Sequence, residues 1–180
     1  MSAVGPELQP WIGVGYRHIR AGAGHDVLDF RFAGFGENNR WNKAGSPALY
    51  LAGDSGIVVA EWGRHLTGNI APGTPLSSQR VVYRLKVRLD SVMDLRLEHN
   101  VEALGFSWSP AWFLDSKVTR SLAEHIRAQG PAQAIIVPSI AFIDDHARWN
   151  LVVFLDKVPA DTSEWVISTE SIGLLQWSGS

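Results

Sequence analysis

The stretch Asn38–Leu66, NNRWNKAGSPALYLAGDSGIVVAEWGRHL, decides the predicted fold. Its short apolar run, residues 48–52, lies between two groups of glycine, serine, proline and aspartate residues. Turn-forming residues on both sides of such a run predict a short strand. The residues after the second turn predict a helix. Arg40 therefore precedes the strand, Tyr50 lies on it and Glu61 lies on the element that follows.

The predicted helix covers about residues 56–66 and brings Glu61 close to an apolar face. Val58 and Trp62 line one side of such a helix. At about 100° per residue, Glu61 lies about 60° from Val58, beside that apolar stripe. The β-branched run at 57–59 favours a strand instead. A carboxylate beside an apolar stripe is more informative about function than one on an outer face.

Length and composition predict one globular domain over residues 1–180. Of the 180 residues, 46% are hydrophobic and 19% are charged, as in ordinary globular proteins. The formal net charge of −2 provides no basic excess, so no direct binding of nucleic acid is expected. The absence of cysteine excludes disulfides and thiolate metal sites.

The sequence also predicts a cytoplasmic protein without a membrane partner. No apolar run approaches the roughly 20 residues that span a bilayer. Residues 1–10, MSAVGPELQP, carry neither a basic nor an apolar signal region.

Predicted strands and helices alternate along the chain, which indicates an α+β fold with a strand-rich core. Residues 26–35 show no clear hydrophobic period, and residues 34–39 form a polar loop. Residues 92–95 extend or follow the strand predicted over residues 80–89. Strands are predicted over residues 13–19, 48–52, 80–89, 134–137, 151–155 and 164–168. Helices are predicted over about 56–66, over 98–104, and from Lys117 or Thr119 to Gly130.

Several common catalytic and nucleotide-binding motifs are absent. The glycine pairs of residues 13–36 lack the third glycine of a dinucleotide fingerprint, and there is no P-loop. The histidines form no H-E-x-x-H, although His65 lies four residues after Glu61. There is no G-x-S-x-G, so Ser139 is not expected to be a triad nucleophile. No metal site is predicted.

Five segments together resemble the RES domain family. The most specific is RWNKAGSPALYLAGDSGIVVAE at 40–61, which resembles the family pattern of Arg-Trp-Asn, Leu-Tyr-Leu-Ala and a glutamate eleven residues after the tyrosine. The sequence departs from the family pattern at two positions. Asn39 stands where glycine is frequent in the family, and His18 stands where tyrosine is seen in relatives. The other segments follow in the family's order: YRHIRAG at 16–22, VRLDSVMDL at 87–95, IIVPS at 135–139 and NLVVFL at 150–155.

The resemblance implies a single domain similar in fold to the ADP-ribosyltransferase toxins. It also implies a toxin of a toxin–antitoxin pair that degrades NAD by cleaving the nicotinamide–ribose bond, and an antitoxin partner with a helix-turn-helix domain. NAD is then the substrate, by hydrolysis or with phosphate as co-substrate, and no cofactor is required. Transfer of ADP-ribose to a protein, or a domain that only binds a partner, are the alternatives.

The resemblance also implies a set of site residues. Arg40, Tyr50, Glu61 and Ser139 are expected to be catalytic, and Arg17 and Asn150 are expected to bind NAD. Glu61 would stabilise the oxocarbenium character of the ribose. The arginines would bind phosphate oxygens, because a guanidinium binds them in a fork.

Overall fold

The computed structural model describes residues 5–31, 33, 39–69 and 77–178. Within these residues the chain forms six strands, three α-helices and three short 3-10 helices. The strands are β1 (Gln9–Arg20), β2 (Ala48–Ala52), β3 (Ser77–Asp94), β4 (Ala134–Pro138), β5 (Trp149–Phe154) and β6 (Val166–Ser178). The α-helices are α1 (Ser55–Asn69), α2 (Glu98–Ala103) and α3 (Ser116–Gln129), and the 3-10 helices are Pro110–Leu114, Ile140–Phe142 and Thr162–Glu164. None of the described helices combines the length and apolar character that crossing a membrane requires.

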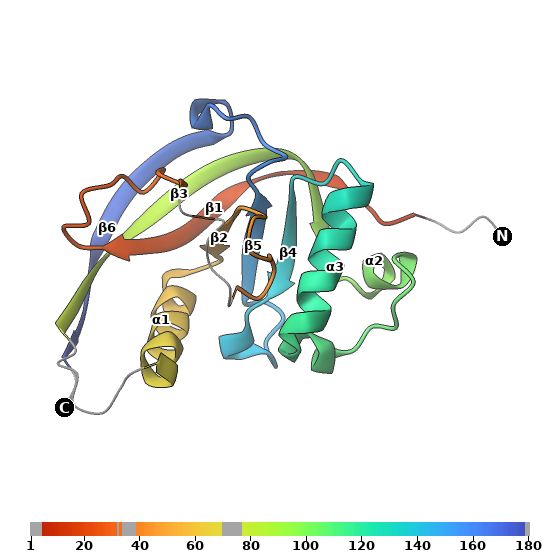
Figure 1. The fold of residues 1–180 in the computed structure, drawn as a ribbon, viewed down its shortest axis with the longest axis horizontal. Coiled ribbons are helices and arrows are strands. Elements are labelled where there is room, and N and C mark those ends of the chain that lie inside the picture. Colours follow the sequence, from red (N-terminus) through yellow and green to blue (C-terminus); the bar gives the residue numbers. More distant parts are fainter. Residues whose placement is uncertain (1–4, 32, 34–38, 70–76, 179–180) are drawn as a thin grey trace.

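The six strands form one strongly curved sheet in the order β1-β2-β5-β4-β3-β6 (Figure 1). Because β1 also pairs with β3, the strands from β1 to β3 close into a barrel-like ring. β3 pairs with β1, β4 and β6 at different points along its length. All of these pairs are antiparallel except β3 with β4.

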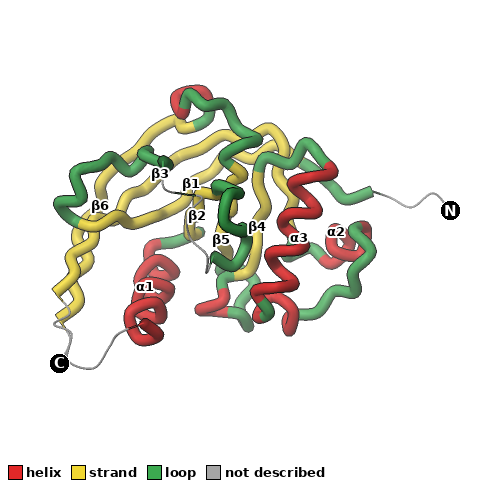
Figure 2. The backbone as a smooth tube through the Cα atoms, viewed as in Figure 1, coloured by secondary structure: helices red, strands yellow, loops and turns green. Residues whose placement is uncertain are grey.

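Alternate residues of the strands fill the interior of the ring, as the two-residue period of a strand requires. Leu49 and Leu51 of β2 belong to one buried cluster with Leu151 and Val153 of β5. The other face of these strands packs against α3, which contributes the fully buried Leu122. The helices α1 and α3 flank the short strands β2, β5 and β4 (Figure 2).

Aspartate side chains fix where two of the helices begin. Asp54 Oδ1 accepts a hydrogen bond of 2.9 Å from the amide of Ile57 at the start of α1. Asp115 Oδ1 accepts one of 2.8 Å from the amide of Lys117 at the start of α3. The cap and the burial of Trp62 outweigh the β-branched run in α1, so the predicted helix is confirmed.

All six predicted strands are present, but several are longer than predicted. β1 begins at Gln9, and β3 continues as one strand through Asp94. The last strand runs from Val166 to Ser178, whereas the sequence predicts 164–168. Side chains 167–174 are exposed on both faces, so the alternation that marks a half-buried strand is missing there. The predicted loop over 34–39 lies almost wholly outside the described residues.

β1 and β2 diverge from a single point of contact. Among the described residues, their ladder consists of one pair, Tyr16 with Ala52. Gly15 permits the close approach there, because a Cβ at this position would lie 2.6 Å from Leu51 Cβ. Beyond Tyr16, β1 continues along β3 to Arg20 while β2 pairs with β5. An opening between the two strands results, and it positions the candidate site.

Candidate active site

Two side chains from neighbouring strands hold Glu61 of α1. Its Oε1 accepts a hydrogen bond of 2.9 Å from Ser139 Oγ and one of 2.6 Å from Asn150 Nδ2. Ser139 follows β4 directly, and Asn150 lies opposite Val137 of β4 in the sheet. Ser139 is 0% exposed and Asn150 is 9% exposed, so the core fixes both donors. The structure therefore brings together three of the predicted site residues.

These hydrogen bonds leave one oxygen of the Glu61 carboxylate for a ligand. Both bonds end on Oε1, and no further side-chain partner of Glu61 occurs among the described residues. Hydrogen bonds to an ionised group are stronger than neutral ones, so the carboxylate is held firmly. Glu61 lines two cavities, and its Oε2 accepts no hydrogen bond from a described side chain.

The two cavities meet at Tyr50, Glu61 and Asn150, which line both of them. The β1 cavity has a volume of about 430 Å³ and lies in the opening between β1 and β2, where Arg17 and Phe30 also line it. The Arg40 cavity has a volume of about 340 Å³; its wall includes Arg40, Trp41, Arg64, Pro138, Ile140 and Ala141. Together they form a two-part cleft with Glu61 at its middle.

Arg17 occupies the β1 cavity. Its Nη1 donates a hydrogen bond of 2.8 Å to the carbonyl oxygen of Val27, and its guanidinium lies 5.5 Å from the centre of the Phe30 ring. Burial lowers the pKa of Arg17 to about 10, so the group remains a cation at neutral pH. His18, the next residue, points toward α1, with its ring 6.1 Å from that of Trp62. His18 and Arg17 both line this cavity.

Arg40 occupies the other cavity and is held by main-chain oxygens. Its Nη1 donates hydrogen bonds of 3.1 Å to Phe113 O and 2.8 Å to Leu114 O. Burial lowers its pKa, and the cations Arg64 and Arg120 lower it further. No carboxylate forms an ion pair with Arg40 within the described part of the chain. A partly buried cation among other cations is suited to an anionic ligand.

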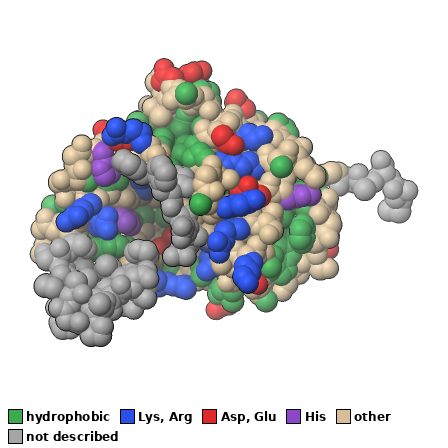
Figure 3. Space-filling view, in the orientation of Figure 1, with side chains coloured by type: hydrophobic (Ala, Val, Ile, Leu, Met, Phe, Trp, Pro, Cys, Tyr) green, Lys and Arg blue, Asp and Glu red, His purple; other side chains and the backbone are tan. Residues whose placement is uncertain are grey.

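Arg64 is a site residue that the sequence interpretation does not include. It lies on α1 one turn after Glu61, lines the Arg40 cavity, and donates a hydrogen bond of 2.8 Å from Nη1 to Ile140 O. Its spacing of three residues from Glu61 was the available signal, because residues at i and i+3 share a helix face. Lys and Arg side chains also gather over α3 on the face shown in Figure 3. The cleft itself contains three arginines, Arg17, Arg40 and Arg64.

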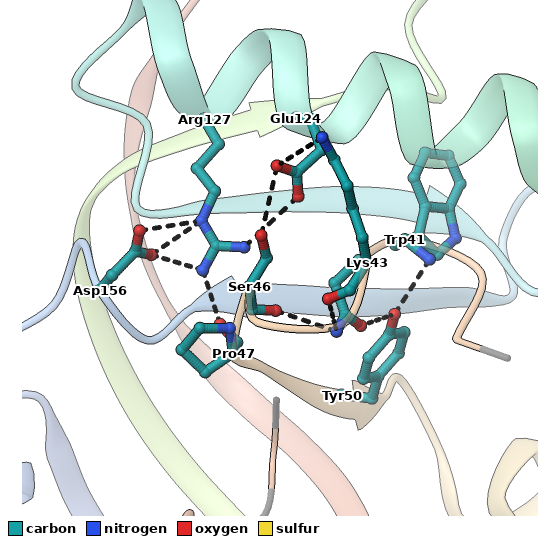
Figure 4. A network of polar contacts seen from close by, with 9 residues as sticks. Trp41, Lys43, Ser46, Pro47, Tyr50, Glu124, Arg127 and Asp156 are labelled. Atoms are coloured by element: carbon teal, nitrogen blue, oxygen red, sulfur yellow. Dashed lines mark hydrogen bonds and ion pairs between the residues drawn. The ribbon is translucent and has the colours of Figure 1, made fainter. Parts of the chain in front are cut away.

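The hydroxyl of Tyr50 is used inside the protein. It accepts a hydrogen bond of 3.0 Å from the amide of Trp41 (Figure 4). It also donates a hydrogen bond of 2.7 Å to Asn42 Oδ1. Burial is the main cause that raises the pKa of Tyr50, so the phenol stays neutral. The ring lines both cavities, while the hydroxyl ties β2 to the segment that carries Arg40. Tyr50 thus forms part of the wall of the cleft, and its hydroxyl holds Trp41 and Asn42.

No group of three or more His, Asp or Glu side chains is placed to hold a metal ion among the residues that the structure describes. The described part of the cleft offers a carboxylate, arginines and neutral hydrogen-bond donors. The Glu61 carboxylate therefore lies between a cavity that contains Arg17 and a cavity that contains Arg40 and Arg64.

Comparison with known proteins identifies the family. No curated protein sequence matches the chain. The fold is similar to a chain in the crystal structure of the M. tuberculosis MbcT–MbcA toxin–antitoxin complex, with a TM-score of 0.61 and 18% identity, over 95% of this chain and 87% of that one. This similarity confirms the predicted α+β fold with a strand-rich core. The RES domain profile matches residues 16–174, and the chain therefore belongs to the RES domain family.

Proposed function

We propose that this RES domain is an NAD-consuming toxin that cleaves the bond between nicotinamide and ribose. The observation that carries the proposal is the position of Glu61. Ser139 and Asn150 hold it where two cavities meet, and each cavity contains an arginine. NAD has the matching chemistry, because its diphosphate is anionic and its ribose becomes cationic as the bond breaks.

Glu61 supplies the electrostatic part of the reaction. Cleavage gives the ribose oxocarbenium character, as in glycoside hydrolysis. The Oε2 oxygen of Glu61 faces this developing charge, while Oε1 remains bonded to Ser139 and Asn150. The apolar residues beside Glu61, among them the buried Val58, reduce the local dielectric and strengthen the interaction. Nicotinamide leaves as a neutral molecule, so a strong general acid is unnecessary.

The arginines bind the charged groups of the substrates. Arg40 and Arg64 offer their guanidinium groups to phosphate oxygens in one cavity, and Arg17 does so in the other. The Tyr50 ring lies against the nicotinamide or the ribose. Water or inorganic phosphate completes the reaction by attacking the ribose carbon from which nicotinamide departs. The new bond to oxygen forms as the bond to nitrogen breaks, and an attacking water releases one proton to solvent.

The cellular role that fits this activity is a cytoplasmic toxin neutralised by an antitoxin. Membership of the RES family and the fold shared with a chain of a toxin–antitoxin complex support this role. An antitoxin with a helix-turn-helix domain is the expected partner. Growth arrest on expression of the wild type, but not of Glu61→Gln, would support the toxin role, whereas equal arrest by both would point to a domain that acts only by binding.

The direct test measures nicotinamide release from NAD with and without inorganic phosphate, using protein purified free of any partner. Release that depends on phosphate identifies phosphorolysis, and release without it identifies hydrolysis. Label from radioactive NAD on a protein band, in place of small products, would instead identify ADP-ribose transfer. Intact NAD after long incubation with folded protein would contradict the proposal.

A further inference from the structure

Asn42 is completely buried beside the cleft although it belongs to no helix or strand. Its side chain is 0% exposed. Oδ1 accepts the hydrogen bond of 2.7 Å from Tyr50, and Nδ2 donates hydrogen bonds of 2.9 Å to Ser46 O and 3.3 Å to Lys43 O. A buried amide with all of its contacts inside the protein specifies one local conformation.

The conformation that these contacts specify is that of the segment carrying Arg40. The Tyr50 hydroxyl that donates to Asn42 also accepts from the Trp41 amide, at 3.0 Å. On the other side, Thr119 Oγ1 of α3 donates a hydrogen bond of 2.8 Å to the carbonyl oxygen of Arg40. Three consecutive residues are therefore tied by side chains to β2 and α3, in place of the regular hydrogen bonds of a helix or strand.

The geometry of the Arg40 guanidinium depends on this support. An arginine side chain has many rotamers, and holding its tip requires a fixed main chain as well as partners at the guanidinium. The tip partners are the main-chain oxygens of Phe113 and Leu114. Loosening the main chain at residues 40–42 shifts the guanidinium relative to both oxygens and to the cavity.

We infer that Asn42 is a positioning residue for Arg40, linking Tyr50 to the turn at residues 43–46 so that the guanidinium stays in its cavity. The inference rests on the proposed function in one respect, because it assigns the guanidinium to substrate binding. Asn42 lines neither cavity, so its influence on a ligand passes through Arg40 and the Tyr50 ring.

A double-mutant cycle tests whether Asn42 affects the KM for NAD through Arg40. Asn42→Ala should raise the KM for NAD about tenfold and change kcat less than about threefold, as expected when binding in the ground and transition states is lost equally. In an Arg40→Ala background it should raise KM less than about twofold further, because residues acting as one unit are not additive. Tyr50→Phe, which removes only the hydroxyl, should behave as Asn42→Ala does. An unchanged KM in both single variants, or fully additive effects with Arg40→Ala, would overturn the inference.

Asn100→Ala is the matched control. Asn100 is 1% exposed and bonds to Asp94 O and the Glu7 amide, at 3.0 and 2.6 Å, on α2 away from the cleft lining. This variant should lose thermal stability as Asn42→Ala does but keep the KM of the wild type. A raised KM in Asn100→Ala would show that the effect reflects general loosening of the fold.

Amide hydrogen exchange tests the positioning without any ligand. The Trp41 and Ser46 amides should exchange at least about tenfold faster in Asn42→Ala than in the wild type, and at wild-type rates in Asn100→Ala. Unchanged exchange at both amides would refute the inference even if the enzyme is active. Failure of the wild type to release nicotinamide would refute the proposed function alone, and exchange would still decide the role of Asn42.

Discussion

Asn150 Nδ2 lies 2.6 Å from Glu61 Oε1, and this contact joins a strand of the barrel to the helix beside it. The second donor to the same oxygen, the Ser139 hydroxyl, is also uncharged. An arginine or lysine partner would cancel the charge of the carboxylate. The two neutral donors orient the carboxylate and leave its charge in place. A carboxylate that is fixed but not neutralised is suited to stabilising a cation that exists only during bond cleavage.

Glu61→Gln should reduce nicotinamide release at least about 100-fold, because the charge facing the ribose is removed. The amide oxygen of glutamine can still accept from Ser139 and Asn150, so the thermal midpoint should stay close to that of the wild type. Release of nicotinamide is followed at saturating NAD. Glu102→Gln, an exposed carboxylate on α2, is the control; activity of Glu61→Gln within about threefold of the wild type would contradict the assignment.

Ser139→Ala should lower kcat about tenfold and leave the KM for NAD nearly unchanged. The substitution removes the 2.9 Å hydrogen bond that orients Glu61 but no group assigned to the charged parts of the substrate. A net loss of about 1–2 kcal/mol in the free energy of unfolding is expected for a buried hydrogen bond to a charged group. Steady-state kinetics and urea denaturation measure the two effects. Ser163→Ala, which alters an exposed serine, should change neither; full activity of Ser139→Ala would exclude an orienting role.

Arg64→Ala should raise the KM for NAD about tenfold and weaken its dependence on salt. The cation lines the cavity that also contains Arg40, and a bidentate arginine–phosphate contact is a strong charge-assisted interaction. KM is measured over a range of ionic strength. Arg84→Ala is the control, since this arginine is half exposed on β3 and pairs with Glu170. Equal KM values for the Arg64 and Arg84 variants would remove Arg64 from the site.

Arg17→Met should weaken NAD binding while leaving the fold equally or more stable. Burial lowers the pKa of Arg17 to about 10. Folding therefore disfavours its charged form, and this cost is fully present below pH 10 and fades as the pH rises further. Methionine of similar volume removes the cost together with the cation. Thermal midpoints at pH 7 measure the effect on stability, and calorimetry with ADP-ribose measures the effect on binding. A large loss of stability would assign Arg17 a structural role.

Asp156→Ala should destabilise the fold without a direct effect on the cleft. Arg127 is 7% exposed and donates from Nε to Asp156 Oδ1 at 2.8 Å and from Nη2 to Pro47 O at 2.7 Å, next to the start of β2. We expect a loss of about 2 kcal/mol, less than for a fully buried pair because the Asp156 side chain is 48% exposed.

The same pair makes stability depend on pH. Burial raises the pKa of Asp156, but the hydrogen bonds and charge of Arg127 lower it more, so the pKa lies below its ordinary value of 3.8. The contribution of this carboxylate is present above pH 3.8 and is lost as the pH falls through the folded-state pKa. The difference in the free energy of unfolding between the wild type and Asp156→Ala should therefore be smaller at acidic pH than at pH 7. A difference that stays constant at all pH values would exclude this linkage.

Residues close together in the sequence were the most predictable part of the site. The segment from Arg40 to Glu61 contains its own turns, strand and helix start, so local chemistry determines most of its structure. The length of β6 was underestimated for the opposite reason, because its exposed Ser, Thr and Glu side chains carry no pattern and its pairing with β3 is non-local. Val82 of β3 belongs to a buried cluster with Ile57 and Val58 of α1, a long-range association that no local pattern encodes.

The roles of Arg64 and Asn42 required the three-dimensional structure. Arg64 is recognised by its bond to Ile140, 76 residues away. Asn42 resembles an ordinary turn residue until the Tyr50 hydroxyl is seen to point at it. The hydroxyl of Tyr50 likewise becomes a structural group only because the Trp41 amide and Asn42 approach it from a loop.

The single pairing of Tyr16 with Ala52 bears on how related chains adapt to ligands of different size. Past this pair, the described main chain of β1 hydrogen-bonds along β3, and that of β2 along β5. Changing the distance between the two cleft walls therefore breaks no hydrogen bond between strands. The width of the cleft then follows the bend of the β1–β3 ribbon. No described β3 residue lines either cavity, although Tyr83 pairs with Arg17. Substitutions in β3 therefore offer evolution a route to bulkier or smaller substrates that leaves the reactive groups in place.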